Sequence, residues 1–238
     1  MEGFVRKILN SSAVDGPGNR MVIFLQGCNL NCTYCHNPET IEIIKEAHDP
    51  IQIMDPKDIL ERVLKVKPFI SGVTFSGGEC TLQYDFLLEV CNLLHQNNIS
   101  ILIDTNGTIN PTKLETLSAY VDGFMLDVKA FSSSTHHALT GQNNENILLN
   151  FDNLARLHKL YEVRTVIVPD IVDNEATIDH VCRILKKHAS HSRYKIIKYR
   201  NYGVRKPYNN SYRTPSDEEM EVYKSRILTQ GIKTVIIT

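Results

Sequence analysis

The sequence has almost no net charge, no long apolar run and no low-complexity tract. Among its 238 residues, 26 Lys and Arg face 27 Asp and Glu, so the formal net charge is -1. Because no strong positive field exists to hold a phosphate backbone, we expect no nucleic-acid partner. No apolar run approaches the roughly 20 residues of a membrane-spanning helix, and the N-terminus lacks the charged-then-apolar layout of a secretory signal. We therefore expect no membrane association and a cytoplasmic location.

The chain also lacks a linker rich in Pro, Gly or Ser that would divide it. Hydrophobic residues make up 42% and charged residues 22%, which is the composition of an ordinary globular protein and disfavours disorder. A chain of 238 residues lies in the range that α/β barrels fill as one unit. We expect a single domain spanning residues 1–238.

Short β-branched, apolar runs alternate with amphipathic stretches along the chain. The expected buried strands are 21–25, 72–75, 99–104, 123–128, 163–168, 194–198 and 233–237. The expected helices are 56–67, 83–97, 111–120, 144–160, 176–189 and 215–230. Such alternation predicts parallel strands with helices outside, in a doubly wound sheet or a full or partial barrel. Both architectures place chemistry beyond the C-terminal ends of the strands.

Three cysteines, Cys28, Cys32 and Cys35, form a C-x3-C-x2-C triplet directly after the first expected strand. Thiolates are soft ligands, so closely spaced cysteines in a reducing compartment indicate a metal or an iron–sulfur cluster better than disulfides. A [4Fe-4S] cluster normally takes four protein ligands. Three cysteines with no fourth thiol nearby would leave one iron open to bind a substrate, which indicates reaction rather than storage.

A zinc site is the inorganic alternative, with His36 added to the three cysteines. Cys35 and His36 are adjacent, and consecutive side chains on an extended loop diverge, so we favour iron–sulfur. The remaining cysteines, Cys91 and Cys182, fall in helix-like patterns and are expected to be buried. Cys80 is also expected to have a packing role. Because it follows Ser76-Gly77-Gly78-Glu79, a position near the site is the alternative.

Polar motifs follow the next three expected strands. Ser76-Gly77-Gly78-Glu79 has two glycines that let the backbone approach a ligand, and a carboxylate suited to an ammonium group. Asp104-Thr105-Asn106-Gly107 is either a functional segment or a simple cap and turn. Asp127 and Lys129 lie on the same side of an extended backbone, as an ion pair or as a pair that positions a ligand. Four consecutive strand ends thus predict one shared site.

Two further segments have weaker signals. Val14-Asp15-Gly16-Pro17-Gly18 is a rigid turn, and its sequence proximity to the cysteine triplet leaves Asp15 able to line a substrate groove. Residues 201–214 are irregular and rich in Asn, Tyr and Arg, which is typical of a long functional loop. The nine histidines, including His136 and His137, show no ligand spacing and are expected at the surface.

The motifs taken in order resemble the glycyl-radical-enzyme activating enzymes of the radical S-adenosylmethionine (SAM) superfamily, and the resemblance covers nearly the whole chain. The cysteine spacing, with an aromatic residue before the third Cys, gives the superfamily, and the ordered set gives the activating enzymes of the pyruvate formate-lyase type. That set is Val14-Asp15-Gly16-Pro17-Gly18, Leu25-Gln26-Gly27-Cys28, Tyr34-Cys35-His36-Asn37, Ser76-Gly77-Gly78-Glu79, Asp104-Thr105-Asn106-Gly107, Met125-Leu126-Asp127-Val128-Lys129, His137-Ala138-Leu139-Thr140-Gly141 and Val166-Ile167-Val168-Pro169.

The resemblance implies an α/β fold, a partial (β/α)6 TIM-like barrel of the radical SAM type. It implies a [4Fe-4S] cluster on the cysteine triplet, with SAM chelating the fourth iron. The residues implied to contact SAM are Gly77, Gly78 and Glu79 at the methionyl amine, Tyr34 and Asn37 near the adenosine, Asp127 and Lys129 at the methionyl end and ribose, and Val168 at the adenine. Those implied to bind a monovalent cation are Asp104, Thr105, Met125 and Asp127, while Asp15 would face the incoming glycine loop.

The implied activity is one-electron reductive cleavage of SAM to a 5′-deoxyadenosyl radical, which removes hydrogen from a glycine of a partner enzyme. That partner would be pyruvate formate-lyase or a related glycyl radical enzyme, and a flavodoxin or ferredoxin would supply the electron. Two alternatives are a radical SAM enzyme acting on a small molecule and a non-catalytic zinc or iron–sulfur binding module.

The chain departs from the family pattern in two places. The pyruvate formate-lyase type has a Tyr-His segment late in the barrel, where this chain has Tyr199-Arg200. Many other activating enzymes insert a ferredoxin-like domain after the cysteine triplet, but residues 37–71 contain no cysteine, so no additional cluster is expected there.

Overall fold

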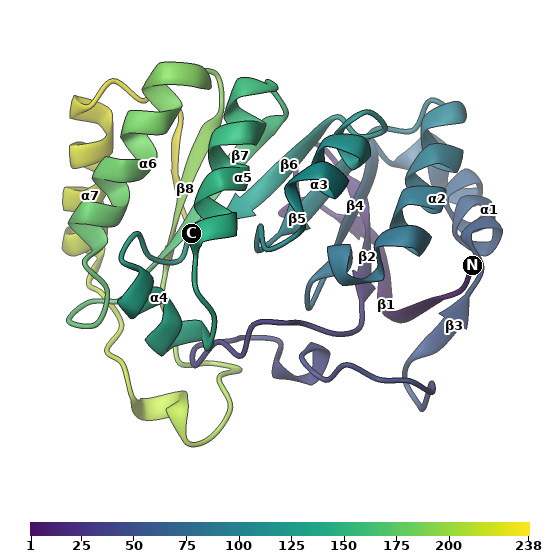
Figure 1. The fold of residues 1–238 in the computed structure, drawn as a ribbon, viewed down its shortest axis with the longest axis horizontal. Helices are drawn as coiled ribbons and strands as arrows, with labels where there is room; N and C mark the ends of the chain where they lie inside the picture. The colour runs from purple at the N-terminus through teal and green to yellow at the C-terminus, as the bar shows by residue number, and fades with distance from the viewer. The chain divides into compact units, whose positions relative to one another are not determined.

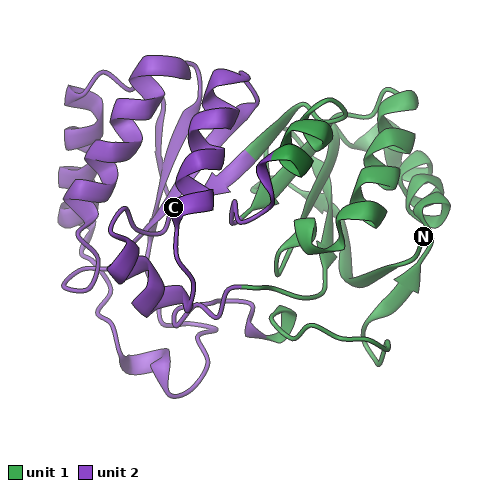
Figure 2. Ribbon diagram, in the orientation of Figure 1, with its two compact units in different colours: residues 1–29, 39–105, 112–124 green, residues 30–38, 106–111, 125–238 purple.

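A computed structural model describes residues 1–238 and has nine strands in one sheet (Figure 1). The order of the strands is β3-β1-β2-β4-β5-β6-β7-β8-β9, so β3 and β9 are edge strands and the sheet is open. The chain falls into two compact units (Figure 2). The first unit comprises residues 1–29, 39–105 and 112–124, and the second comprises 30–38, 106–111 and 125–238.

The first unit is built on parallel strands whose carboxyl ends carry the predicted motifs. β2 and β4 pair in register from Arg20 opposite Gly72 to Leu25 opposite Gly77. Its parallel strands are β2 (Arg20–Leu25), β4 (Gly72–Gly77), β5 (Ile101–Thr105) and the first two residues of β6 (Gly123–Asp127). Its α-helices are α1 (Pro56–Val66), α2 (Tyr84–Gln96) and α3 (Pro111–Ser118), of which Pro111 belongs to the second unit.

Two antiparallel strands of the first unit were not predicted. β1 (Gly3–Ser12) pairs with β2, and β3 (Gln52–Met54) pairs with β1. β1 interrupts its apolar pattern with Arg6 and Lys7, and it contains a register shift at this point. A strand with a bulge and charged residues lacks the simple period of two, so its sequence does not indicate a strand.

The expected amphipathic helix at 83–97 is confirmed as α2. It buries one face made by Phe86, Leu87, Val90, Cys91 and Leu94, which recur at the three- and four-residue spacing of a helix. Short 3-10 helices complete the unit; their bounds are Pro38–Thr40 (η1), Lys67–Phe69 (η2) and Cys80–Gln83 (η3), with Pro38 in the second unit.

The second unit repeats the parallel β/α arrangement. β7 and β8 pair in parallel from Glu162 opposite Arg193 to Ile167 opposite Lys198, and β8 pairs with β9 in parallel. The strands are the end of β6, β7 (Leu160–Ile167), β8 (Arg193–Lys198) and β9 (Val235–Ile237). The helices are α4 (Ser133–Thr140), α5 (Glu145–Arg156), α6 (Asn174–His188), α7 (Asp217–Thr229) and the 3-10 helix η4 (Tyr208–Asn210).

Helix α4 was not predicted, and it corrects the expectation that all histidines lie at the surface. The helix begins where the Ser132 hydroxyl accepts a hydrogen bond from the Thr135 N–H, and it ends at Gly141, whose φ of 78° is left-handed. His136 on this helix is fully buried, whereas His137 is exposed. The sequence here is rich in Ser and Thr, which favour caps and turns and so gave no helical signal.

The predicted helix 144–160 is shorter than expected. α5 ends at Arg156, and His158 has a positive φ of 56° that turns the chain into β7 at Leu160. The remaining predicted strands and helices are present with small differences at their ends. None of the helices is long and apolar enough to cross a membrane.

Candidate functional site

The end of β4 packs against the residue that precedes the first cysteine of the triplet. The Glu79 N–H donates a hydrogen bond to the Gly27 carbonyl oxygen over 2.8 Å, and the Gly78 N–H donates to the Leu25 carbonyl over 3.1 Å. A Cβ atom on Gly78 would lie 2.3 Å from the Gly27 oxygen, and one on Gly77 would lie 2.1 Å from the Leu25 oxygen. Both glycines are therefore required for this approach, which brings the Ser-Gly-Gly-Glu motif and Cys28 together.

Glu79 is a buried carboxylate, with 1% of its surface exposed. Its Oε1 atom accepts hydrogen bonds from the Thr81 N–H (3.1 Å), the Thr81 hydroxyl (2.5 Å) and the Thr105 hydroxyl (2.8 Å). A buried carboxylate must be satisfied by donors or by a positive charge. The arrangement fixes the orientation of Glu79 and suits it to accept a hydrogen bond from an ammonium group.

Cys80 has a packing role. Its side chain is fully buried, with Sγ 3.4 Å from the Asp104 carbonyl oxygen. Burial raises the pKa of the Cys80 thiol well above its ordinary value, and the neighbouring Glu79 raises it further, so the thiol is neutral. Cys91 and Cys182 are also buried, as expected, and the structure contains no disulfide.

Asp15 lies at the other end of β2 from Cys28. Its turn precedes Arg20, the first residue of β2, whereas Cys28 follows Leu25, the last. The Asp15 carboxylate accepts a hydrogen bond from the Ser12 hydroxyl over 2.5 Å, and its carbonyl accepts one from Thr74 over 2.7 Å. Asp15 and Cys28 thus flank opposite ends of β2, and the role of Asp15 at a substrate groove stays a prediction.

In the second unit, residues 30–38 are attached to the end of α4. The Asn31 N–H donates to the Thr140 carbonyl over 2.8 Å, and the Thr33 N–H donates to the Leu139 carbonyl over 2.9 Å. The Cys35 N–H donates to the Cys32 carbonyl over 3.2 Å, so these two cysteines lie on one tight turn.

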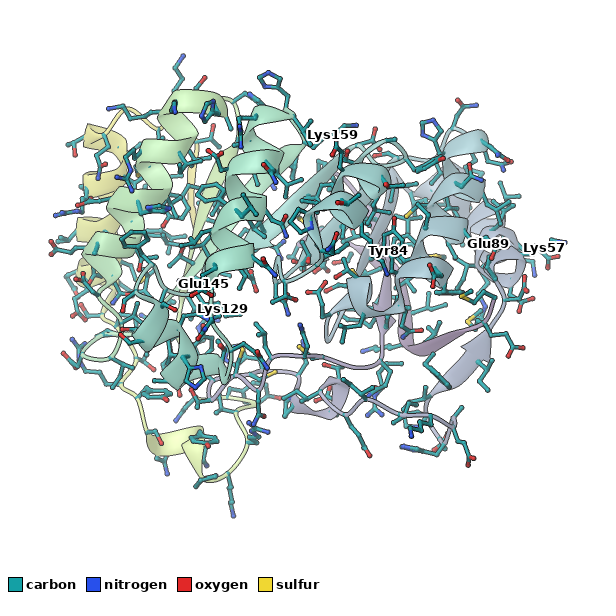
Figure 3. All side chains as sticks on the ribbon, in the orientation of Figure 1. Lys57, Tyr84, Glu89, Lys129, Glu145 and Lys159 are labelled. Atoms are coloured by element: carbon teal, nitrogen blue, oxygen red, sulfur yellow. The ribbon has the colours of Figure 1, made fainter.

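The predicted ion pair of Asp127 and Lys129 is present, with Nζ and Oδ2 2.8 Å apart. Lys129, labelled in Figure 3, also lies over the Tyr34 ring, with Nζ 6.0 Å from the ring centroid. Burial is the largest single influence and lowers the pKa of Lys129, but the charge and hydrogen bond of Asp127 together with Cys32 and Tyr34 hold that pKa well above its ordinary value. Burial raises the pKa of the Cys32 thiol, and the positive charge of Lys129 opposes that rise. Lys129 thus favours the thiolate form that binds metal.

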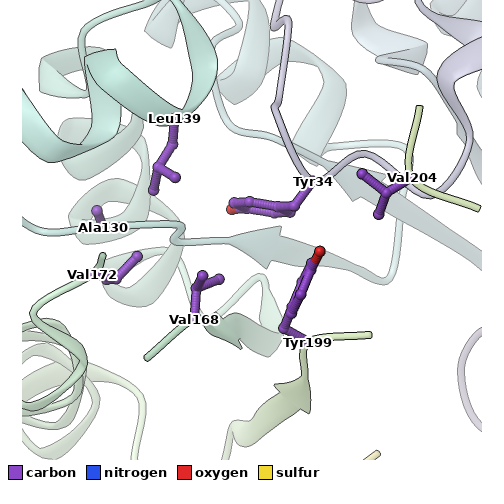
Figure 4. Packing of buried hydrophobic residues seen from close by; sticks show 7 residues of the cluster. All are labelled: Tyr34, Ala130, Leu139, Val168, Val172, Tyr199 and Val204. Carbon is purple, nitrogen blue, oxygen red and sulfur yellow. The ribbon is translucent and has the colours of Figure 1, made fainter. Parts of the chain in front are cut away.

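An apolar cluster surrounds Tyr34 in the second unit (Figure 4). Its members are Tyr34, Ala130, Leu139, Val168, Val172, Tyr199 and Val204. The cluster brings together Tyr34 and Val168, both predicted near the adenosine. The hydroxyls of Tyr34 and Tyr199 are buried in it without a hydrogen-bond partner. Buried hydroxyls normally have partners, so these two are suited to a polar ligand.

A loop formed by residues 199–212 also contacts the cysteine segment, through contacts that local sequence patterns do not indicate. The ring Nε2 of His36 is 2.8 Å from the Arg200 carbonyl, which requires a proton on Nε2. The Tyr212 hydroxyl donates to the Thr33 hydroxyl over 2.8 Å. The Arg205 guanidinium donates to both the side chain and the carbonyl of Asn31, the latter over 3.3 Å. His36 is thus engaged by the loop, which disfavours it as a zinc ligand, and the neighbouring Asn37 is exposed.

The residues predicted for a cation have other partners inside each unit. In the first unit, the Ser76 hydroxyl donates to Asp104 over 2.9 Å, and Thr105 donates to Glu79. In the second, Met125 Sδ is 3.0 Å from an Arg164 guanidinium nitrogen. The structure gathers no group of three His, Cys, Asp or Glu side chains that could hold a metal ion, and this includes the cysteine triplet, so the cluster ligands also stay a prediction. The cation site stays a prediction.

Comparison with known proteins identifies the family. The sequence matches the radical SAM superfamily over residues 22–185. It is 31% identical over 235 residues to the pyruvate formate-lyase-activating enzyme of Staphylococcus epidermidis, covering 92% of each chain. It is 30% identical over 253 residues to a putative glycyl-radical enzyme activating enzyme of Haemophilus influenzae, covering 98% of this chain and 95% of that one. The chain belongs to the activating enzymes of the radical SAM superfamily.

The fold of this radical SAM protein agrees with that of solved structures. A crystal structure of a domain of pyruvate-formate lyase-activating enzyme from Bacteroides vulgatus aligns with a TM-score of 0.61 at 22% identity, covering 71% of this chain and 99% of that one. The predicted fold class is confirmed, with an open sheet of parallel β/α units to which β1 and β3 add an antiparallel edge.

Membership of the superfamily implies an iron–sulfur cluster and SAM as cofactors. The donor types of this chain suit both. Three thiols on one short segment are a suitable donor set for iron, and Lys129 favours the thiolate of Cys32. The buried hydroxyls of Tyr34 and Tyr199 in the second unit suit polar groups of SAM, and the buried carboxylate of Glu79 in the first unit suits an ammonium group.

Proposed function

We propose that this chain is a glycyl-radical-enzyme activase, in which Cys28, Cys32 and Cys35 hold a [4Fe-4S] cluster. When bound, the cluster and SAM supply a 5′-deoxyadenosyl radical, which removes a hydrogen atom from one glycine of a partner enzyme. The observation that carries the proposal is the packing of Gly77-Gly78-Glu79 on Gly27, directly before Cys28, in a chain whose relatives are named activating enzymes. The partner would be pyruvate formate-lyase or a related glycyl radical enzyme.

The residues of this chain would bind SAM by charge and shape. Glu79 would accept hydrogen bonds from the methionyl ammonium, since its three donors already fix its orientation. Asp127 and Lys129 would fix the methionyl end and the ribose through their paired charges. Tyr34 and Val168 would cover the adenine with apolar surface, and Asn37 would lie beside it. The backbone of Gly77 and Gly78 would border the amine.

Two further roles belong to the proposal. Asp104, Thr105, Met125 and Asp127 would supply oxygen and sulfur atoms to a monovalent cation. Asp15 would contact the glycine loop of the partner. Residues 1–238 would act as one catalytic domain, with a flavodoxin or ferredoxin as the source of the electron. Because the cluster needs reduced thiols, we place the activity in a reducing, cytoplasmic compartment.

Cys32→Ala tests the proposal, and Cys91→Ala serves as its control. Anaerobically reconstituted wild type should be brown and should convert SAM to 5′-deoxyadenosine when dithionite is added. Cys32→Ala should lose both the colour and the cleavage, because one of three thiolate ligands is gone. Cys91 is buried on α2 away from the triplet in sequence, so Cys91→Ala should keep both at a cost of about 1 kcal/mol in stability.

The partner reaction is tested by electron paramagnetic resonance. A glycyl radical signal should form in a candidate partner enzyme only when SAM, dithionite and wild-type activase are all present. Brown Cys32→Ala protein that still cleaves SAM would disprove the ligand assignment. Cleavage of SAM by the wild type without a glycyl radical in any glycyl radical enzyme would favour a small-molecule substrate instead.

A further inference from the structure

Three segments of the second unit meet around Cys32 and Cys35. They are residues 30–38, 131–144 and 199–212, the last visible in yellow-green below α4 (Figure 1). Together these segments contain no Asp and no Glu, and their cations are Arg200, Arg205 and Lys206. In a chain with a net charge of -1, the three segments that meet around Cys32 and Cys35 thus carry only positive charges, with Asp217 the nearby carboxylate that interacts with Arg200.

The outward side chains of the 199–212 loop form the surface that we call the cationic face. Arg200, Tyr202 and Lys206 are exposed, and Tyr202 is 89% exposed. Arg205 is partly buried, since its guanidinium binds Asn31. An exposed tyrosine flanked by basic side chains is typical of a protein–protein contact, because Tyr and Arg are enriched in interfaces.

Cations next to the loop are paired with carboxylates, whereas Lys206 on the cationic face has no ion-pair partner. Lys198 pairs with Asp217 over 2.5 Å, and Arg213 pairs with Asp170 and Glu219 over 2.8 Å. Arg200 makes a small contribution to the lowered pKa of Asp217, which is set mainly by Lys198. No carboxylate lies within ion-pair distance of Lys206, so its charge is available to a partner.

We propose that the cationic face, made by Arg200, Tyr202 and Lys206, is the docking surface for an acidic electron-transfer protein of the flavodoxin class. The inference rests on the proposed function and names the place where its reductant binds. In the step concerned, the reduced flavin loses one electron and the iron–sulfur centre gains it, and no bond is formed or broken in the activase. Charge complementarity of this kind steers encounter and suits the small, transient interfaces of redox proteins.

The contacts of the loop favour the electron donor over the glycyl radical enzyme as occupant. The loop is hydrogen-bonded to Asn31, Thr33 and His36, so it covers the cysteine segment rather than leaving it open. An electron can cross a packed loop. A glycine must instead reach the SAM carbon directly, and to do so here it would have to displace the hydrogen bonds between the loop and residues 30–38. The donor therefore fits this face, and the glycine loop needs another approach.

Lys206→Glu tests the inference, with Lys186→Glu as a matched charge reversal on the exposed last turn of α6. The measurement is the rate of SAM cleavage driven by an acidic flavodoxin reduced to its hydroquinone, compared with the rate driven by dithionite. At low ionic strength, Lys206→Glu should lower the flavodoxin-driven rate about fivefold. The loss should vanish near 1 M salt, where the Debye length is about 3 Å. Tyr202→Ala should raise the flavodoxin concentration for half-maximal rate about threefold without this salt dependence.

The dithionite rate separates this inference from the proposed function. Docking at the cationic face is supported if all variants cleave SAM at the same rate with dithionite and only Lys206→Glu and Tyr202→Ala are slower with flavodoxin. If wild type fails to cleave SAM with dithionite, the proposed function fails and the inference falls with it. If Lys206→Glu and Lys186→Glu have the same flavodoxin-driven rate of SAM cleavage, docking at the cationic face is disproved. The proposed activase function is not affected by that result. If Lys206→Glu slows glycyl radical formation under dithionite alone, the face belongs to the glycyl radical enzyme.

Discussion

Glu79 shows how a single residue joins two motifs. Its backbone N–H binds Gly27 before Cys28, and its side chain takes hydrogen bonds from Thr81 and Thr105. The neutral hydroxyls orient the carboxylate without cancelling its charge. A carboxylate held in one orientation suits the role that we propose for Glu79 at the SAM ammonium.

Glu79→Gln is expected to weaken SAM binding about tenfold, which corresponds to about 1.4 kcal/mol, because a hydrogen bond to a charged group is replaced by one to a neutral group. The amide oxygen can still accept the three hydrogen bonds, so the fold and the cluster should be retained. Binding is measured by equilibrium dialysis with reconstituted protein, and the cluster by its absorbance.

Glu89→Gln provides the control for that variant, since Glu89 is an exposed residue of α2 that pairs with the N-terminal ammonium. Unchanged SAM affinity in Glu79→Gln would remove Glu79 from the SAM site. A loss of cluster colour would show that the carboxylate serves folding instead.

At the scale of elements, the cysteine segment 30–38 is held from two sides. The carbonyl oxygens at the end of α4 accept the amides of Asn31 and Thr33, and the 199–212 loop binds Asn31, Thr33 and His36. Neither element was predicted to make these contacts. Together they restrict the conformations of the segment that carries Cys32 and Cys35.

Tyr212→Phe should accelerate loss of the cluster by about fivefold, because it removes the hydrogen bond to Thr33, worth about 1 kcal/mol. The rate is followed as bleaching of the visible absorbance after a chelator is added under anaerobic conditions. Tyr208→Phe is the matched control, since the Tyr208 ring lies over Arg205 and its hydroxyl makes no hydrogen bond to residues 30–38. Equal bleaching rates in the two variants would contradict the role of the loop in holding the cysteines.

Helix α4 should make the stability of the fold sensitive to acid. His136 is buried, its Nδ1 lies 2.8 Å from the Gln142 carbonyl, and burial lowers its pKa below the ordinary value of 6.5. A histidine with a lower pKa in the folded chain takes up a proton on unfolding. The contribution of neutral His136 to the free energy of unfolding is therefore present above pH 6.5 and is lost as the pH falls below 6.5.

We expect the free energy of unfolding to fall between pH 7 and pH 5, by up to about 1.4 kcal/mol per pH unit from His136. The His136→Asn variant should be less stable at pH 7. Its free energy of unfolding, measured by urea titration, should change less steeply between pH 7 and pH 5 than that of the wild type. His137→Asn, a change at the exposed neighbour, should leave the slope as it is. A slope that persists in His136→Asn would assign the acid sensitivity to other groups.

The elements that could be predicted are those with a strong repeating pattern. α2 presents Phe86, Val90 and Leu94 at helical spacing, and the parallel strands are continuous apolar runs. β1 and α4 lack such a pattern, because charged or Ser- and Thr-rich residues interrupt it. The hold of the 199–212 loop on the cysteine segment depends on contacts between residues more than 160 positions apart, which local patterns do not encode.

At the scale of the whole molecule, the parallel topology explains why polar motifs follow strand ends within each unit. In the first unit, Cys28 and Glu79 follow the paired strands β2 and β4, and the hydrogen bond from Glu79 to Gly27 joins these two strand ends. Asp15 shows where this reasoning stops, because it precedes β2 and so lies at the strand's opposite end. Its proposed role is toward a partner protein rather than toward SAM.

Asp15→Asn should separate the two halves of the reaction. The turn that bears Asp15 also exposes Val14 to 75%, so it offers an apolar and a charged side chain to a partner. Asn retains a hydrogen-bond acceptor for the Ser12 hydroxyl but lacks the charge. We expect SAM cleavage with dithionite to be unchanged and glycyl radical formation, measured by electron paramagnetic resonance, to fall about tenfold, since a hydrogen bond to a charged group contributes about 1.5 to 3 kcal/mol.

Ser12→Ala distinguishes recognition from turn structure. This variant removes the internal hydrogen bond of Asp15 but keeps its charge. If Asp15 binds the partner, Ser12→Ala should retain most of the glycyl radical yield while Asp15→Asn loses it. If both variants lose it equally, Asp15 acts by holding its turn. If neither does, the partner is recognised elsewhere, because a molecule with a net charge of -1 has no overall field to replace a lost local contact.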